Sequence, residues 1–141
     1  MPTVFVAMLH ATGDWTIAAV AQGASTLAVA VLCVRVWRGT DDPFARVLAL
    51  ASGTFLATPY AFDYDSTLLG APFVLLLRRV WSSGSSRGET LALVAMWLAP
   101  LVVWLGSTWL GQQIGPVLFA ALMAQALASA RRADDPAALA A

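Results

Sequence analysis

The chain has 141 residues, of which 60% are hydrophobic and only 11% are charged. Soluble globular domains carry about 25% charged residues, so this composition excludes an ordinary soluble domain and indicates a protein whose solvent is the lipid bilayer. Eight basic and eight acidic residues balance to a formal charge of zero, and no basic excess points to a nucleic-acid partner.

The first apolar run covers residues 16–34 and lies between a tryptophan and Arg35. Aromatic and basic residues at the ends of an apolar run are typical of a transmembrane helix, so we expect a span over residues 16–37. Ala19 and Gly23 are four residues apart, a spacing that suits close contact with another helix. No basic residue precedes Arg35, so the basic region of a secretory signal peptide is missing and this helix is expected in the mature protein.

Two shorter helices are expected next, with an elbow between them. Pro43 follows two aspartates and suits the start of a helix over residues 44–59, which Pro59 ends because proline has no backbone donor. A third helix is expected over residues 64–78, where the apolar run meets two arginines. We define the elbow as residues 57–70, with the sequence ATPYAFDYDSTLLG.

The last two helices follow a polar segment, RRVWSSGSSRGE. A fourth span is expected over residues 90–110, with a kink at Pro100, and a fifth over residues 115–131. Residues 133–141 are expected to form a disordered cytoplasmic tail. The predicted fold class is therefore all-α, an integral membrane bundle of about five transmembrane helices within residues 1–132.

The placement of the charges predicts how these helices are oriented. If each helix crosses the membrane once, all eight arginines fall on one side. These are Arg35, Arg38, Arg46, Arg78, Arg79, Arg87, Arg131 and Arg132. By the positive-inside rule that side is cytoplasmic, which places the N-terminus outside and the C-terminus in the cytoplasm. Four tryptophans fall near predicted helix ends, as in an aromatic belt: Trp15, Trp37, Trp81 and Trp109.

The elbow is the candidate site. Non-helical backbone and carboxylates at membrane depth are tolerated only against protein or a watery cavity. We therefore predict that Asp63, Asp65, Tyr60 and Tyr64 line a cavity open to the outside and contact a hydroxylated substrate, a cation or a basic group. The alternative is local: Asp65 or Ser66 caps the next helix, and the tyrosines are interface aromatics.

Other polar residues offer weaker candidates. His10, the only histidine, is expected near the outer end of the first span as a proton acceptor or phosphate contact, or simply as a solvated side chain. Gln22 and three further glutamines can bond between helices or to a ligand, and helix packing is favoured. The sequence identifies no cofactor and leaves open whether a divalent metal takes part. It contains no glycine-rich phosphate loop, zinc-ligand spacing or nucleophile triad.

The phrase L-A-T-P-Y-x-F-D-Y-D, residues 56–65, lies within FLATPYAFDYDSTLLGAPFVLLL. Together with the opening MPTVFVAM and the order of the spans, it resembles the C-terminal part of the bacterial membrane glycosyltransferases of family 87, formerly the domain of unknown function DUF2029. The resemblance covers most of this chain. It implies a GT-C-type fold, a location in the bacterial inner membrane, and hexosyl or mannosyl transfer from a polyprenyl-phosphate sugar donor on the outer face.

In enzymes of this type the catalytic acid lies in the first external loop, near the N-terminus, and that region has no counterpart here. The resemblance therefore implies a fragment that is inactive alone, with an N-terminal enzyme half encoded upstream as a partner. Donor or acceptor contacts would come from the elbow residues and His10. The alternative is a non-enzymatic small membrane protein, either an accessory subunit or part of a transporter.

Overall fold

The structure, a computed structural model, describes residues 3–84, 86–109 and 113–133; within these ranges the side chains of residues 63, 64, 83, 107 and 133 are not described. The described part is all-helical and contains no strand. Its elements are α1 (Val4–Thr12), α2 (Trp15–Gly39), α3 (Pro43–Ala57), the 3-10 helix η1 (Asp63–Leu69), α4 (Gly70–Ser83), α5 (Arg87–Trp109) and α6 (Gly115–Ala133). The predicted tail, residues 133–141, lies outside the described residues apart from the last residue of α6.

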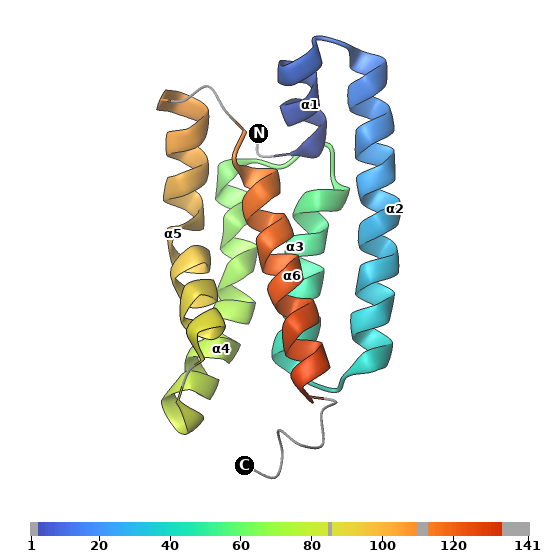
Figure 1. Cartoon of the computed structure of the whole chain (residues 1–141). Helices are drawn as coiled ribbons and strands as arrows, with labels where there is room; N and C mark the ends of the chain where they lie inside the picture. Colours follow the sequence, from blue (N-terminus) through green and yellow to red (C-terminus); the bar gives the residue numbers. More distant parts are fainter. Residues whose placement is uncertain (1–2, 85, 110–112, 134–141) are drawn as a thin grey trace.

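Helices α2 to α6 run alternately down and up, so that each short connection joins antiparallel neighbours (Figure 1). As a result, α2, α4 and α6 end where α3 and α5 begin. We call this the arginine end, because the helix termini that meet there carry the arginines of the chain. The elbow lies toward the opposite end, and we call that the elbow end.

Helix α3 is the centre of the bundle. It packs against α2, α4, α6 and η1, and more than half of its residues are buried. On its α6 side, the rings of Phe55 and Phe119 stack with their centroids 4.1 Å apart and their planes within 5°. On the α2 side the two backbones approach closely at Gly53, where a Cβ atom would lie 2.9 Å from Val29 Cγ1 and 3.0 Å from Cys33 Sγ.

The small residue at the close contact between α2 and α3 is not the one that the sequence predicts. Gly23 is exposed, and a Cβ atom built on it would meet nothing within 4 Å. The prediction of a close contact at Gly23 is therefore wrong. The glycine that lets two helices approach is Gly53 on α3, because the buried face of α2 is turned toward α3 through Gln22, Val29 and Val36.

Helix α1 has no counterpart among the predicted elements. Its N-cap, Thr3, accepts a hydrogen bond from the Val6 backbone N–H at 3.3 Å, and its C-cap, Gly13, has φ 68°, which favours glycine. Asp14 then caps α2 by accepting from the Thr16 N–H at 2.7 Å and from the next N–H at 3.1 Å. Helices α1 and α2 therefore form a tight hairpin whose turn lies at the elbow end (Figure 1).

The five other α-helices lie where spans are predicted, with two differences. The third begins as the 3-10 helix η1 and continues as α4 to Ser83, beyond Arg78 and Arg79. The fourth, α5, begins three residues before its predicted start and contains Pro100 within the helix, where a kink is predicted. The ends of α2 and α6 agree with the predicted ends to within two residues, the usual precision of a helix boundary.

Two helices are long and apolar enough to cross a membrane by length and composition, namely Trp15–Gly39 and Arg87–Gly106; α3 is a shorter apolar helix. Only 17% and 22% of the residues in the most apolar windows of the two long helices are buried. The core helix of a soluble protein is mostly buried, and these two helices instead present large apolar side chains on the outside of the bundle. On α5 these are Leu91, Val94, Trp97, Leu101, Trp104, Leu105 and Trp109.

Candidate functional site

The elbow exists because α3 ends at Ala57, two residues before Pro59. A helix interior pairs each carbonyl with the N–H four residues later, and Pro59 has no N–H for the carbonyl of Phe55. The carbonyls of Leu56 and Ala57, next in the chain, also lose their helical partners once the backbone turns away. Buried carbonyls without partners are costly, so other donors are required at this point.

Helix α2 supplies those donors. Gln22 Nε2 donates to the Leu56 carbonyl at 3.0 Å, and Ser25 Oγ donates to the same oxygen at 2.9 Å. Thr26 Oγ1 donates to the Ala57 carbonyl at 2.9 Å. These three side chains stand within two turns of an otherwise apolar helix, and their spacing places them on one side of it. We call them the α2 donor set.

Gln22 also reaches α1. Its Oε1 accepts a hydrogen bond from the Phe5 backbone N–H at 3.0 Å, while its side chain is almost fully buried at 6% exposure. The interhelical use expected for this glutamine is confirmed. Sequence reasoning did not single out Ser25 and Thr26, although hydroxyls within an apolar span are a recognisable signal of helix contacts.

The turn after Pro59 is closed by short-range hydrogen bonds. Thr58 Oγ1 donates to the Tyr60 carbonyl at 3.0 Å. Asp65 Oδ2 accepts from the Phe62 N–H at 2.8 Å, and the Asp65 N–H donates to the Phe62 carbonyl at 3.0 Å. Asp65 thus orders the first turn of η1 from within it. The prediction that Asp65 or Ser66 is the N-cap of the next helix is wrong, because Phe62 is the N-cap of η1 and Leu69 that of α4; Asp65 acts from the third position of η1.

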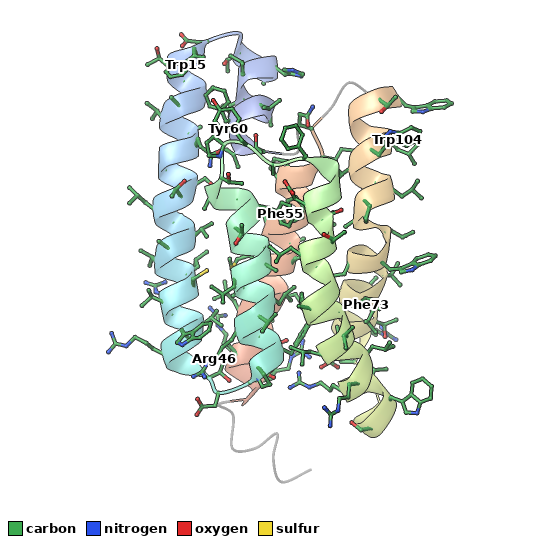
Figure 2. The ribbon with its side chains drawn as sticks, turned by 180° about the vertical axis from the view of Figure 1, so that it is seen from behind. Trp15, Arg46, Phe55, Tyr60, Phe73 and Trp104 are labelled. Atoms are coloured by element: carbon green, nitrogen blue, oxygen red, sulfur yellow. The ribbon has the colours of Figure 1, made fainter. Side chains whose placement is uncertain are left out.

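A cavity of about 480 Å³ lies beside the elbow, between the end of α3 and η1. Among the residues that the structure describes, its lining combines five polar residues with three apolar ones. The polar residues are Thr54, Thr58, Tyr60, Asp65 and Thr67, and the apolar ones are Phe55, Ala61 and Leu68. The volume is within the range of about 300 to 1,000 Å³ that is typical of small-molecule sites. Figure 2 places Tyr60 and Phe55 toward the elbow end, away from Arg46.

The predicted site residues separate into three groups. Tyr60 and Asp65 both line the cavity, and Tyr60 is 68% exposed. The backbones of Asp63 and Tyr64 lie in η1, but their side chains lie outside the described part of the structure. His10 is exposed on the last turn of α1 and does not belong to the described cavity lining.

The cavity is rich in hydrogen-bond acceptors. Thr54 Oγ1 already donates its proton to the Leu50 carbonyl at 2.8 Å, and Thr58 Oγ1 donates to Tyr60, so only lone pairs of these hydroxyls remain for a ligand. The Asp65 carboxylate adds further acceptors. A ligand with several hydroxyl donors suits this lining. Among the described side chains, no group of three histidine, cysteine, aspartate or glutamate residues is placed to hold a metal ion.

Comparison with known protein families, with the curated proteins and with the solved structures finds no match to this chain.

Proposed function

We propose that this chain is a membrane-embedded module of a glycosyltransferase that takes a hexose, such as mannose, from a polyprenyl-phosphate donor. In this proposal the elbow cavity holds the hydroxylated part of the donor or the acceptor. The observation that carries the proposal is the acceptor-rich cavity formed by Tyr60, Asp65 and the threonines, at the elbow that bears the family-87-like phrase.

The membrane part of the proposal is supported by the surface of the bundle. The most apolar windows of α2 and α5 are 17% and 22% buried, so most of their apolar area faces outward, as it does for helices in lipid. The alternation of the helices gathers the arginine-bearing helix ends at one end of the bundle (Figure 1). By the positive-inside rule we assign the arginine end to the cytoplasm and the elbow end to the outside of a bacterial inner membrane.

The chemistry would divide between this chain and an N-terminal half. The acceptor hydroxyl oxygen attacks the anomeric carbon, the bond from that carbon to the phosphate oxygen breaks, and polyprenyl phosphate leaves. The proton of the acceptor hydroxyl passes to a carboxylate in the first external loop of the N-terminal half, which acts as general base. This chain would contribute contacts to the sugar, and alone it would be inactive.

A second function is favoured by a separate observation. Asp65 Oδ2 is already used to order η1 through the Phe62 N–H at 2.8 Å, so the carboxylate has a purely structural use. In that case the chain is a non-enzymatic membrane protein, either an accessory subunit or part of a transporter. The cavity then results from the shape of the elbow and binds no sugar.

Binding of a polyprenyl-phosphate mannose to the full chain in detergent micelles distinguishes the two functions. Tyr60→Ala removes an exposed aromatic from the cavity lining, whereas Phe62→Ala removes an exposed aromatic two residues away that is not part of the described lining. We expect Tyr60→Ala to weaken binding about tenfold, through the lost phenol hydrogen bond and ring contact, with little effect of Phe62→Ala. Equal effects of the two variants, or no binding by the wild type, would favour the non-enzymatic function.

A further inference from the structure

A second surface lies at the other end of the molecule, on α4. A cavity of about 370 Å³ with both polar and apolar walls lies between the start of α3 and the last turns of α4, and its polar lining is Asp42, Arg78, Arg79 and Ser82. An apolar groove of about 400 Å³ adjoins it along the outside of α4. The two share Arg78 and Ser82, so a single ligand with a polar head and an apolar tail can occupy both.

The apolar groove is one face of a single helix. Val74, Leu77, Arg78 and Trp81 follow one another at the i, i+3, i+4 and i+7 spacing that aligns side chains along a helix. Val74 is 61% exposed and Trp81 is 87% exposed. The groove therefore presents an apolar strip that leads from mid-helix to an arginine and then to a tryptophan near the end of α4.

The two neighbouring arginines of α4 differ in their charge partners. The guanidinium of Arg79 lies 2.9 Å from Asp42 Oδ1 and 3.5 Å from Glu89 Oε1, and it also lies over the ring of Phe44. Its charge is already compensated within the protein. Arg78 forms no ion pair with any described residue and lines both the cavity and the groove. One uncompensated positive charge therefore stands where the cavity meets the apolar strip.

We propose that this surface binds an anionic phospholipid. The phosphodiester accepts hydrogen bonds from the guanidinium of Arg78, one acyl chain lies along Leu77 and Val74, and the indole of Trp81 lies at headgroup level. Charge complementarity selects this occupant, because a phosphate matches the free guanidinium and an acyl chain matches the strip beside it. The proposal rests on the membrane placement proposed above and is independent of the glycosyltransferase activity.

Quenching of tryptophan fluorescence by brominated lipids in nanodiscs tests this site. The contribution of Trp81 is the quenching of the wild-type chain minus that of Trp81→Phe. We expect brominated phosphatidylglycerol to associate with this groove about fivefold more strongly than brominated phosphatidylcholine, the preference that one arginine confers at an anionic membrane surface. Arg78→Gln is expected to abolish this preference, and Arg78→Lys to retain most of it.

Arg38→Gln is the matched control, because Arg38 is exposed near the end of α2 and belongs to neither lining. The Arg38→Gln variant is expected to prefer the anionic lipid as strongly as the wild type does. Circular dichroism checks that each variant keeps its helices. The proposal is overturned if the wild type shows no preference or if the two glutamine variants lose it equally. It is also overturned if millimolar inorganic phosphate removes the preference, since the site would then bind a free phosphate.

Discussion

Helix α3 has backbone groups without helical partners at both of its termini, and the two ends of the bundle pair these groups by different means. At the elbow end, neutral donors from α2 pair with the carbonyls of Leu56 and Ala57, which have no helical partner where α3 ends, and one of these donors, Gln22, is almost fully buried. At the arginine end, Asp42 caps the start of α3 by accepting from the Phe44 N–H at 3.1 Å and pairs with Arg79. One end is held by buried neutral hydrogen bonds, and the other by a charged pair of the buried Asp42 with the partly exposed Arg79.

This difference bears on what each end can do. Neutral hydrogen bonds inside an apolar bundle have no competing water, so the backbone of the elbow and the cavity beside it are held in one geometry. At the arginine end, the pair of Arg46 with the 99% exposed Asp41 is screened by salt and contributes little, so these side chains can exchange partners at small cost. A preorganised cavity suits specific recognition of a ligand, and an adaptable charged surface suits lipid headgroups.

The largest expected effect comes from breaking the neutral network. Gln22→Leu removes one of the two donors to the Leu56 carbonyl, which keeps Ser25, and leaves the Phe5 N–H without its acceptor. We expect a loss of about 2 kcal/mol in the free energy of unfolding, from two hydrogen bonds in an apolar setting. Chemical unfolding in mixed detergent micelles, followed by circular dichroism, measures it.

Gln125→Leu is the matched control for this prediction. Gln125 lies on α6, and its buried Nε2 has no hydrogen-bond partner among the described residues. Replacing it with leucine removes a polar group that is not satisfied, so the free energy of unfolding should stay the same or rise. Equal losses in the two variants would mean that the α2 donor set does not hold the elbow.

The middle of α3 offers a second test, because the comparison of its ends assumes that the helix itself is held in place by close packing. Gly53→Ala brings a Cβ atom to 2.9 Å from Val29 Cγ1, and we expect a net loss of about 1 kcal/mol in the free energy of unfolding after the gain in helix propensity. Gly23→Ala meets no neighbour within 4 Å and should gain about 0.5 to 1 kcal/mol. A gain in both variants would show that α2 and α3 can separate without cost.

The positions of the longer helices were predictable from the sequence, because a long apolar run flanked by aromatic and basic residues is typical of a helix that crosses a membrane. Helix α2 was expected over residues 16–37 and occupies Trp15–Gly39. Helix α1 was not predicted, because its nine residues are too short to suggest a span and part of its backbone is paired by Gln22, a contact across the fold. The 3-10 geometry of η1 was also missed, since apolar periodicity does not distinguish a tight first turn from an α-helix.

The candidate site was predictable as a segment and only partly as a set of contacts. Pro59 and the acidic residues after it mark the elbow in the sequence, and Tyr60 and Asp65 do line a cavity there. The hydroxyls of Thr54 and Thr58 were not predicted as lining, because nothing local shows that the end of α3 faces η1. The hydrogen bond from the Phe62 N–H to Asp65 was also not predictable, because it depends on the turn that forms. The spacing of the two aspartates, two residues apart, does not specify that turn.

The smallest expected effect compares two adjacent aspartates at the arginine end. The side chain of Asp42 is only 6% exposed and pairs with Arg79, whereas the side chain of Asp41 is 99% exposed and pairs with Arg46. Asp42→Asn keeps an oxygen that can cap α3, and Arg79 is 36% exposed and keeps Glu89 as a charge partner, so we expect a loss below about 1 kcal/mol in the free energy of unfolding. Asp41→Asn should have no measurable effect, because the Asp41 carboxylate is 99% exposed and solvent screens its attraction to Arg46. The loss in Asp42→Asn should shrink as salt concentration rises, since screening already weakens the wild-type pair. A loss that does not change with salt would mean that the arginine end, like the elbow end, is held by hydrogen bonds and packing and not by charge.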